Sequence, residues 1–365
     1  MRVYMATFYR RNYGSALQAF ALQHKLMELG CDAVLIEPAP RDVKLIPRMV
    51  RFLKPDKHYG LGRKIRLLVQ KRKIQVKYSK IDAFVNTHIV TEPFMSCYRA
   101  IQEGNCILMA GSDQIWSVIH SPVDDFYLFK FAPRNGSVRR FSYAASIGLS
   151  ALTEAQIDYY KKALADFEVV SFREQVACDI LGSKLVGATV RNDVDPTLLF
   201  DGKFWGTVAA GQPREKPYIF VYMLRPDKRL MQMAYRLAKR TRREIVYMGL
   251  FVNRYRGVET VADAGVEEFL SYIKNADFVI TNSFHGTVFS VLFEKRFLSV
   301  KIASTSSRAE NVLGFLGLSD RLVSSVDDVE KAFLPIDFKK ANTALQEKRM
   351  SSIEYLTEVA RIAQT

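Results

Sequence analysis

The 365-residue sequence has few of the residues that mark disulfide-rich, metal-binding or membrane proteins. It contains four cysteines, and none of them stands in a CxxC or another metal-ligand spacing, so we expect buried, reduced thiols. No run of about 18 consecutive apolar residues is present, which argues against a membrane-spanning helix. The first residues lack the charged and apolar regions of a signal peptide. These absences predict a cytoplasmic protein.

Several motifs that accompany well-known chemistries are also missing. No GxxxxGK[ST] loop occurs, and no GxGxxG follows a predicted strand, which removes the usual phosphate-binding loops of nucleotide enzymes. Neither an HExxH zinc motif nor a GxSxG nucleophile elbow is found. We therefore predict no metal site. The missing motifs also argue against a metal-dependent hydrolase and against an enzyme driven by nucleotide hydrolysis.

Positive charge is abundant but unevenly placed. The formal net charge is +15, and residues 41–80, with fourteen Lys and Arg against two Asp, account for +12 of it. In this basic insert, apolar and basic residues alternate at helical spacing, which is typical of helices at an anionic membrane surface. A pair of solvated helices covering the first domain fits the same pattern, whereas the scarcity of aromatics argues against nucleic acid. The residues expected to contact a membrane are Arg48, Arg51, Lys54, Arg63, Lys64 and Arg66.

The order of apolar segments predicts an α/β protein. Buried strands at 3–8 and 33–36 flank a helix that is expected from Ser15, which is the βαβ opening of a parallel sheet. Strands and helices alternate more clearly after residue 217. The sequence thus predicts two doubly wound, Rossmann-like domains that face a cleft. Their expected ranges are residues 1–205 and 215–340, with a linker at 201–217 and a helix over 341–365 that packs back.

A polar segment with one histidine follows a buried strand predicted in the second half. It reads Thr281-Asn-Ser-Phe-His-Gly-Thr287 and lies where a strand ends and a helix begins, a position that favours anions. His285 is the group there that can exchange a proton near neutral pH. Gly286 permits close backbone approach, and Ser283 and Thr287 offer hydroxyls. A histidine that simply packs in the core is the alternative interpretation.

Polar residues also follow strands predicted in the first half. Arg173 could bind a phosphate or carboxylate with its planar guanidinium, or it could pair with Glu174 or another acid. Asp113 could accept a hydrogen bond or a proton from a sugar hydroxyl, although an Asp that only forms a turn fits equally. Asp195, in an Asp-Pro pair, is interpreted as part of a turn.

Seven short segments, taken in order, resemble the motifs of the polysaccharide pyruvyl transferase family. They are Asn12–Ala19 (NYGSALQA), Gly111–Trp116 (GSDQIW), Ser142–Ser146 (SYAAS), Ser171–Glu174 (SFRE), Asp195–Leu199 (DPTLL), Thr281–Phe289 (TNSFHGTVF) and Ser307–Asn311 (SRAEN). Each motif alone is weak, but seven in sequence are specific. The resemblance spans about residues 1–320 and skips the basic insert.

This resemblance implies a two-domain fold like that of the GT-B glycosyltransferases. It also implies transfer of the enolpyruvyl unit of phosphoenolpyruvate to two hydroxyls of one sugar, which gives a cyclic pyruvate ketal without a cofactor. In the family, a His at the position of His285 acts as acid and base, and arginines bind the donor. Some members carry an Arg where this chain has Ser283, so the donor has to be held by Arg173, Arg308 or the helix N-terminus.

The expected site residues then fall into groups. The catalytic pair is His285 and Asp113. The donor site comprises Arg173, Ser283, Gly286, Thr287 and Arg308, with the second domain on the donor side. The acceptor site comprises Asn12, Tyr13, Gly14, Ser112 and Gln114, with the first domain on the acceptor side.

The basic insert has a place in the same scheme. Bacterial surface polysaccharides such as capsules are assembled on polyprenyl-diphosphate carriers at the inner face of the cytoplasmic membrane. The resemblance therefore implies a lipid-linked sugar as acceptor and a cytoplasmic protein that is peripheral on that face. The same basic residues of the insert would then contact the membrane or the diphosphate of the lipid carrier. Two alternatives stay open: a GT-B glycosyltransferase that uses a nucleotide sugar, and a non-catalytic assembly protein at the membrane surface.

Overall fold

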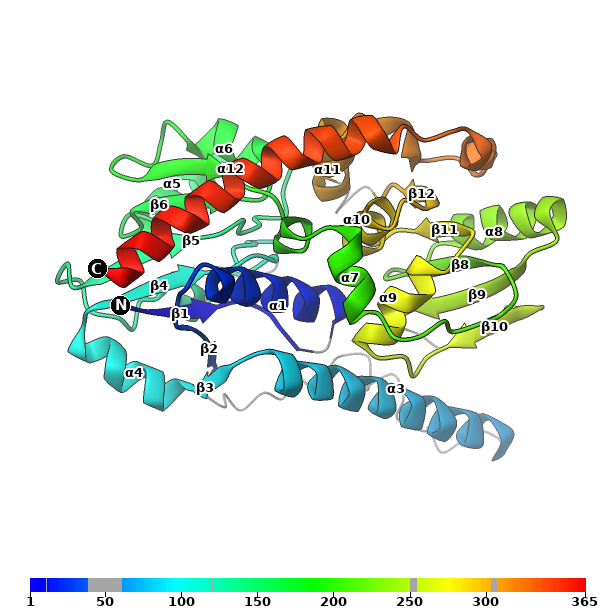
Figure 1. The fold of residues 1–365 in the computed structure, drawn as a ribbon, viewed down its shortest axis with the longest axis horizontal. Coiled ribbons are helices and arrows are strands. Elements are labelled where there is room, and N and C mark those ends of the chain that lie inside the picture. Colours follow the sequence, from blue (N-terminus) through cyan, green and yellow to red (C-terminus); the bar gives the residue numbers. More distant parts are fainter. Residues whose placement is uncertain (11, 39–60, 120, 250–254, 303–306) are drawn as a thin grey trace.

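Two parallel β-sheets, one from each half of the chain, lie side by side and are flanked by helices (Figure 1). The computed structural model describes residues 1–10, 12–38, 61–119, 121–249, 255–302 and 307–365, without the side chains of residues 61–69 and 307. Buried apolar side chains pack on both faces of each sheet. Each sheet therefore has helices covering it on two sides, as in doubly wound proteins.

The first sheet has seven strands in the order β3-β2-β1-β4-β5-β6-β7, and all neighbours are parallel. Its strands are β1 (Arg2–Ala6), β2 (Ala33–Glu37), β3 (Thr91–Pro93), β4 (Cys106–Ala110), β5 (Val138–Ser142), β6 (Val169–Phe172) and β7 (Thr189–Asn192). Its helices are α1 (Tyr13–Glu28), α3 (Leu61–His88), α4 (Phe94–Glu103), α5 (Glu154–Ala163) and α6 (Gln175–Leu181). Central strands such as β4 are continuous apolar runs because both of their faces are buried.

The second sheet has six strands in the order β10-β9-β8-β11-β12-β13, again all parallel. Its strands are β8 (Tyr218–Met223), β9 (Glu244–Gly249), β10 (Val258–Val261), β11 (Phe278–Thr281), β12 (Arg296–Val300) and β13 (Leu322–Val323). Its helices are α8 (Lys228–Thr241), α9 (Val266–Lys274), α10 (Phe284–Leu292) and α11 (Ser307–Phe315).

In both sheets the strand order reverses between two central neighbours. These are β1 and β4 in the first sheet and β8 and β11 in the second. A doubly wound sheet opens a crevice at such a reversal, beyond the carboxyl ends of the strands, and ligands bind there. The predicted fold class, two doubly wound α/β domains, is confirmed.

The segment 201–217 differs from the expected linker, because it contains the helix α7 (Gly202–Val208). Asp201 caps this helix by accepting a hydrogen bond of 2.9 Å from the Phe204 amide. Trp205 is fully buried, and its indole Nε1 donates to the carbonyl oxygen of Thr197 at 2.9 Å. Burying this large aromatic side chain outweighs the cost of two glycines in a helix, about 1 kcal/mol each.

The last helix, α12 (Phe338–Gln364), starts beside the second sheet and runs back along the first (Figure 1). Buried Tyr355 donates a hydrogen bond of 2.8 Å to the carbonyl oxygen of Ser142 at the end of β5. Ser352 donates to Asp193 Oδ1 at 2.9 Å. The expectation of a C-terminal helix that packs back is confirmed.

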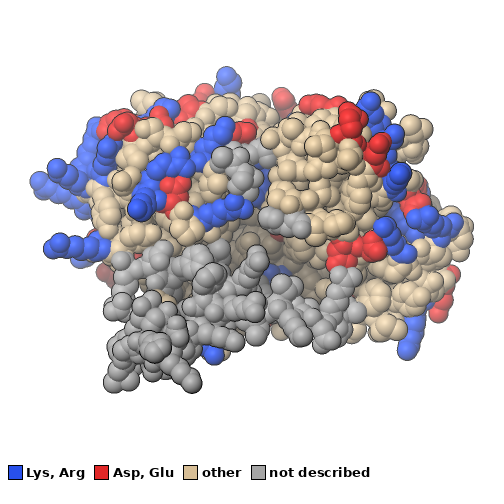
Figure 2. Space-filling view, turned by 180° about the vertical axis from the view of Figure 1, so that it is seen from behind, with Lys and Arg blue, Asp and Glu red and all other residues tan. Residues whose placement is uncertain are grey.

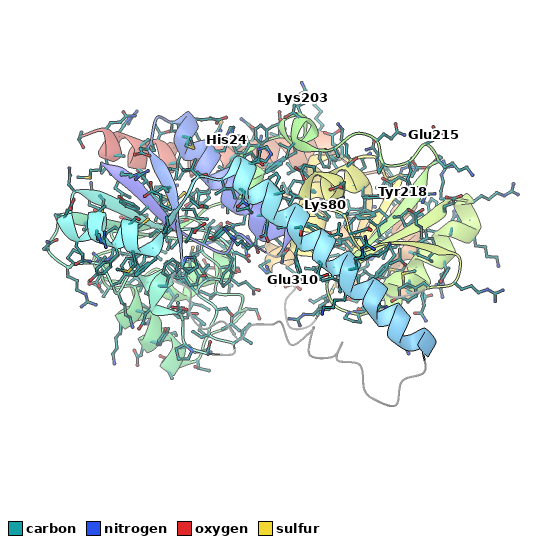
Figure 3. All side chains as sticks on the ribbon, turned by 90° about the horizontal axis from the view of Figure 1, so that it is seen from below. His24, Lys80, Lys203, Glu215, Tyr218 and Glu310 are labelled. Carbon is teal, nitrogen blue, oxygen red and sulfur yellow. The ribbon has the colours of Figure 1, made fainter. Side chains whose placement is uncertain are left out.

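The basic insert contributes most of α3, a long helix that lies against α1 and also reaches α9 of the second sheet (Figures 1 and 3). Its later turns are apolar on one side, and Ile81, Phe84 and Val85 are buried in the core. The expected membrane contacts stay a prediction. Arg63, Lys64 and Arg66 belong to α3 but their side chains are not described, and Arg48, Arg51 and Lys54 lie outside the described residues.

Outside the insert, acidic and basic side chains are interspersed over much of the surface seen in Figure 2, in keeping with a low net charge there. None of the helices in the described ranges is both long enough and apolar enough to cross a bilayer.

Candidate active site

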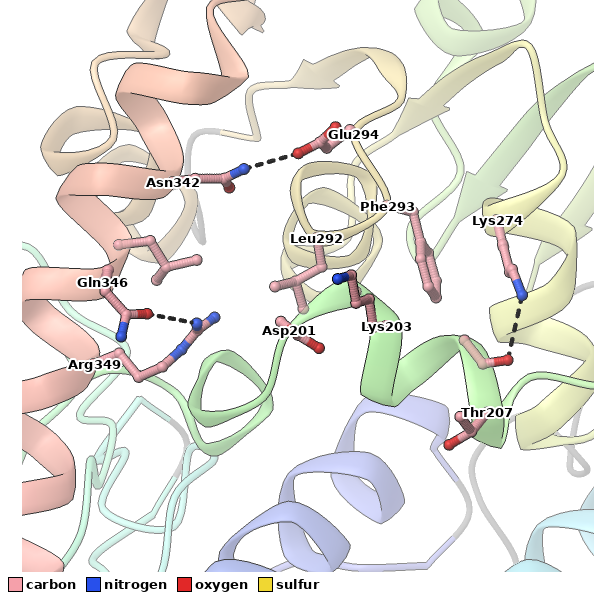
Figure 4. A pocket seen from close by; sticks show the side chains of 13 residues that line it. Asp201, Lys203, Thr207, Lys274, Leu292, Phe293, Glu294, Asn342, Gln346 and Arg349 are labelled. Atoms are coloured by element: carbon pink, nitrogen blue, oxygen red, sulfur yellow. Dashed lines mark hydrogen bonds between the residues drawn. The ribbon is translucent and has the colours of Figure 1, made fainter.

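Two cavities of the described structure are candidates for a binding site. The larger, of about 860 Å³, is lined by α7, α12 and the end of α10, at the amino-terminal edge of the second sheet (Figure 4). Two of its cations are already engaged: Lys274 Nζ lies 3.3 Å from the Gly206 carbonyl oxygen, and Arg349 Nε lies 2.7 Å from that of Leu198. The smaller cavity, of about 270 Å³, lies beyond the carboxyl ends of the strands. We take this smaller cavity as the candidate active site, because both strand reversals open there.

Both halves of the chain form the wall of this cavity. The first half contributes Asn12 at the start of α1 and Asp113 and Gln114 after β4. The second half contributes Ser283 and His285 at the start of α10 and Arg308 on α11. All six belong to the predicted site, and they converge because the carboxyl ends of the two sheets face each other.

His285 stands in the first turn of α10, directly after β11. Ser283 caps this helix by accepting a hydrogen bond of 3.3 Å from the Gly286 amide. Gly286 has no room for a side chain, since a Cβ there would lie 2.4 Å from Thr281 Oγ1. Gly14, across the domain junction, also has no room for a side chain, because a Cβ there would lie 1.9 Å from His285 Nδ1. The imidazole is therefore confined between its own helix and the first turn of α1.

Asp195, fully buried, lies behind His285. Its Oδ2 atom accepts a hydrogen bond of 2.6 Å from Arg173 Nη1 and lies 3.7 Å from His285 Nε2. That second distance is too long for a hydrogen bond but short enough for strong attraction to a protonated imidazole. Burial alone would raise the pKa of Asp195, but His285 and then Arg173 hold this pKa below its ordinary value. Asp195 is thus an ionised carboxylate that lies next to His285.

Arg173 and Arg308 differ although both lie over the ring of Phe284, at 4.7 and 5.6 Å from its centroid. Arg173 is only 2% exposed and is paired with Asp195. Arg308 lines the cavity and forms no ion pair with any residue in the described ranges. Burial, and then the nearby Arg173, lower the pKa of Arg308 to about 10, so it is still charged at neutral pH. Arg308 is the cation available to an anionic ligand.

Asp113 presents a carboxylate from the opposite wall. Its backbone is left-handed, with φ of 73°, which turns the chain sharply after β4. Its Oδ2 accepts a hydrogen bond of 2.6 Å from Ser15, and its Oδ1 accepts one of 2.8 Å from the Gln114 amide. The residue is therefore both a turn former and a fixed acceptor at the cavity, so the two interpretations of the sequence are compatible.

Five other predicted residues lie behind the cavity wall rather than in it: Tyr13, Gly14, Ser112, Gly286 and Thr287. The Thr287 hydroxyl bonds to Ser299 Oγ at 2.8 Å, and Ser112 lies 3.4 Å from Asp195 Oδ2. The Tyr13 ring is buried between the two domains. In this geometry these residues support the wall and are not placed to contact a ligand in the cavity. Arg173 likewise lies behind the cavity wall and is not among the residues that line the cavity.

Asp195 is the main residue that the sequence interpretation missed. The Asp-Pro pair does start a short turn, in which Asp195 Oδ1 accepts hydrogen bonds from the amide and hydroxyl of Thr197. Its place among the seven family-like segments was the available signal. Only the packing of the two domains, however, brings this carboxylate to His285.

Solved structures with the same arrangement of two domains define the class of fold. A putative UDP-N-acetylglucosamine 2-epimerase from Listeria monocytogenes matches with a TM-score of 0.53 and 10% identity, over 95% of this chain and 90% of that one. The UDP-GlcNAc 2-epimerase from Neisseria meningitidis bound to UDP-GlcNAc matches with a TM-score of 0.51 and 8% identity, over 100% of this chain and 99% of that one. Anabaena HepE in complex with UDP and glucose matches with a TM-score of 0.52 and 8% identity, over 98% of this chain and 97% of that one. At these identities the likeness shows the fold alone, which is GT-B.

The family follows from the sequence. The model of the polysaccharide pyruvyl transferase family matches residues 12–304, a range that contains Asn12, Asp113, Arg173, Asp195 and His285. No curated protein sequence matches the chain. The chain belongs to the polysaccharide pyruvyl transferase family and is a transferase, as the seven motifs predicted.

Proposed function

We propose that this protein transfers the enolpyruvyl unit of phosphoenolpyruvate onto two hydroxyls of one sugar and so forms a cyclic pyruvate ketal. The observation that carries this proposal is the presence, in one cavity, of an imidazole, His285, and a guanidinium without an acid partner in the described chain, Arg308. A donor that bears a carboxylate and a phosphate needs such a cation, and addition to its double bond needs a proton donor. Membership of the family supports the same chemistry.

The first step adds one sugar hydroxyl to the donor. Protonated His285 gives its proton to the methylene carbon, whose new C–H bond takes the electrons of the double bond. The hydroxyl oxygen attacks the adjacent carbon, and its proton passes to Asp113, which faces the cavity from the other wall. The product is a tetrahedral adduct with a new methyl group and the phosphate still attached.

The second step replaces the phosphate with the second hydroxyl of the same sugar. The carbon–oxygen bond to phosphate breaks, and its electron pair leaves with the phosphate, which takes the proton held by Asp113. The second hydroxyl bonds to the same carbon and gives its proton to His285. Both residues end in the protonation states in which they began, so no cofactor is needed.

The charges around His285 suit these steps. Asp195 is an ionised carboxylate paired with Arg173, and its Oδ2 lies 3.7 Å from His285 Nε2. At this buried position electrostatic attraction is strong, so Asp195 offsets the positive charge of His285 while it delivers the proton. Arg308, on the cavity wall, stabilises the negative charge that gathers on the departing phosphate. Ser283 lines the same cavity, and its hydroxyl oxygen also caps α10 by accepting the hydrogen bond from the Gly286 amide.

The proposed acceptor is a sugar in a lipid-linked precursor of a polysaccharide repeat unit, handled in the cytoplasm at the inner face of the membrane. The support for this part is the charge of the basic insert, +12 over residues 41–80. Flotation with liposomes tests it directly: we expect binding to vesicles with anionic lipid at low salt, and no lipid-dependent binding would contradict it.

The reaction itself is tested by incubating the purified protein with phosphoenolpyruvate and a panel of lipid-linked sugars. We expect a mass gain that corresponds to one pyruvate ketal, with one phosphate released for each ketal. UDP-sugars are the control donors in the same assay and in thermal-shift titrations. Stabilisation by a UDP-sugar but not by phosphoenolpyruvate, with transfer of the glycosyl group, would overturn the proposal. Binding of neither donor would favour a non-catalytic assembly protein.

A further inference from the structure

The helix α3, which belongs largely to the basic insert, contacts both domains. On the first-domain side, its residues Ile81, Phe84 and Val85 are buried in the core beside α1. On the second-domain side, Lys73 Nζ lies 3.6 Å from Asp263, and Lys80 forms an ion pair with Glu268 of α9. Figure 3 shows α3, with Lys80 on it, crossing from one half of the molecule to the other.

The fit of α3 against the second domain is close. A Cβ on Gly265, just before α9, would lie 2.9 Å from the Cβ of Lys80. Exposed ion pairs contribute little stability by themselves, because water screens them. The contact of α3 with the second domain therefore depends mainly on its buried side chains.

Lys77 is the centre of that buried part. It is only 7% exposed, and its Nζ lies 4.3 Å from the centre of the Tyr13 ring in α1. It has no ion pair among the described residues, and burial lowers its pKa to about 8. A cation over an aromatic ring is attracted by the electrons of that ring, and more strongly where water is excluded. The cost of burying Lys77 is thus offset chiefly by its contact with Tyr13.

Tyr13 in turn inserts into the second domain. Its ring stacks on Phe269 of α9, with centroids 4.7 Å apart and an angle of 11° between the planes. Its hydroxyl donates a hydrogen bond of 2.8 Å to the carbonyl oxygen of Ala264. Tyr13 therefore joins α1, α3 and α9 at one point.

The next residue, Gly14, is the one that packs against the imidazole of His285 without room for a Cβ. A displacement of Tyr13 moves Gly14 and so changes the wall that confines His285. We propose that α3 is a clasp between the two domains, and that Lys77 and Tyr13 are positioning residues which hold the first turn of α1 against His285. This inference goes beyond the proposed function, because it concerns how the site is held together rather than which donor it takes.

The test compares Lys77→Ala with Lys71→Ala, a matched control on the same helix whose lysine is exposed and unpaired within the described chain. Hydrogen exchange is measured in peptides that cover residues 12–20 and 263–270. We expect faster exchange in both peptides for Lys77→Ala and no change in the exchange rate for Lys71→Ala. Unchanged protection from hydrogen exchange in Lys77→Ala, or the same loss of protection in Lys71→Ala, would contradict the proposal that Lys77 holds the two domains together. This readout does not depend on the identity of the donor.

Steady-state kinetics with whichever donor and acceptor are turned over adds a second criterion. For Lys77→Ala we expect kcat to fall roughly tenfold or more with little change in either KM, since a misplacement of about 1 Å at a reacting group can cost on the order of 100-fold. Lys71→Ala, the exposed control on the same helix, should keep the kcat of the unchanged protein. A merely structural role would lower the melting temperature of Lys77→Ala without changing kcat of the folded fraction, and that result would contradict positioning.

Discussion

The two walls of the cavity differ in chemistry. The wall from the second domain presents an imidazole, His285, and a guanidinium without an ion pair among the described residues, Arg308, beside the start of a helix. The wall from the first domain presents a fixed carboxylate and two amides, Asp113, Gln114 and Asn12, and Arg173 behind it is paired with Asp195. The second wall suits an anion that must be protonated, and the first suits neutral hydroxyls that must be oriented and deprotonated.

This contrast shows that the sign of the free charge, rather than the number of charged residues, distinguishes the two sides. Arg173 is paired with Asp195, whereas Arg308 has no ion pair within the described part of the chain. If donor and acceptor occupy separate walls in this way, substitutions on the two walls should affect different kinetic constants.

The largest expected effect is that of His285→Ala on the donor wall. Loss of the proton donor should lower kcat by about 10²–10⁴-fold, while binding of phosphoenolpyruvate, measured by calorimetry, should persist. Phosphate release and ketal mass are measured in parallel. The control is His24→Ala, because the His24 side chain is 40% exposed on α1. Phosphate release by His285→Ala at a near-normal rate in the presence of acceptor would refute the assigned role.

A comparably large effect is expected where the two walls touch, from Gly14→Ala. The added methyl would lie 1.9 Å from His285 Nδ1, so the imidazole has to move. We expect kcat to fall on the order of 100-fold with a folded protein, as judged by circular dichroism. Gly211→Ala is the matched control, since a Cβ there meets no atom within 4 Å. Equal rates for the two variants would show that the contact with His285 has no part in catalysis.

The two arginines should respond differently. Arg308→Ala should weaken binding of phosphoenolpyruvate by roughly 10–100-fold, the range expected for a charge-assisted hydrogen bond, and leave the melting temperature nearly unchanged. Arg173→Ala should mainly destabilise the fold, by about 3–5 kcal/mol, because it leaves buried Asp195 without its partner. Donor titration and denaturant unfolding of both variants separate the outcomes; the reverse pattern would place the donor on Arg173.

The acceptor wall should respond through other constants. Asp113→Asn keeps the left-handed backbone, which Asn tolerates, but it removes the proton acceptor and one of the two oxygens that accept hydrogen bonds from Ser15 and the Gln114 amide. KM for the acceptor should rise several-fold and kcat should fall on the order of 100-fold, because the base that takes the hydroxyl proton is lost, while KM for phosphoenolpyruvate stays the same. Separate titrations of donor and acceptor measure this. A change confined to the donor's KM would contradict the division into two walls.

The smallest effect concerns the contact that joins the two domains outside the cavity. The pKa of Lys77 is about 8 in the folded protein and 10.5 in an ordinary lysine, so the unfolded state binds more protons between these values. The free energy of unfolding should therefore rise with pH from about 8 to 9.5, by on the order of 1 kcal/mol. Urea unfolding at several pH values measures the slope. Lys77→Met should lose this slope, and Lys71→Met should keep it.

Much of the fold could be predicted from local pattern. Apolar runs such as Cys106–Ala110 and Phe278–Thr281 had to be buried strands, and alternation with helices implied parallel sheets. The segment 201–217 could not be predicted in the same way. Its glycines favoured a linker, and only the burial of Trp205 against distant residues made it a helix.

The candidate site was predictable to a similar degree. His285 and Asp113 follow strands, and the carboxyl ends of parallel strands collect functional groups wherever the sheet lies. Arg173 and Arg308 are alike in sequence, and nothing local shows that one of them is paired with Asp195. The role of Asp195 depends on a contact across 90 residues of chain, which no spacing reveals.

The sequence by itself determined which residues follow strands, which family the motifs resemble and where the positive charge lies, because these depend on neighbours along the chain. Only the tertiary structure decided which arginine is free, that Asp195 stands behind His285 and that part of the basic insert joins the two domains. Those properties arise from burial and from short distances between residues far apart in sequence, such as 3.7 Å between His285 Nε2 and Asp195 Oδ2 and 4.3 Å between Lys77 Nζ and the centre of the Tyr13 ring. In a low-dielectric interior, such distances determine which charge is neutralised and which remains to bind a ligand.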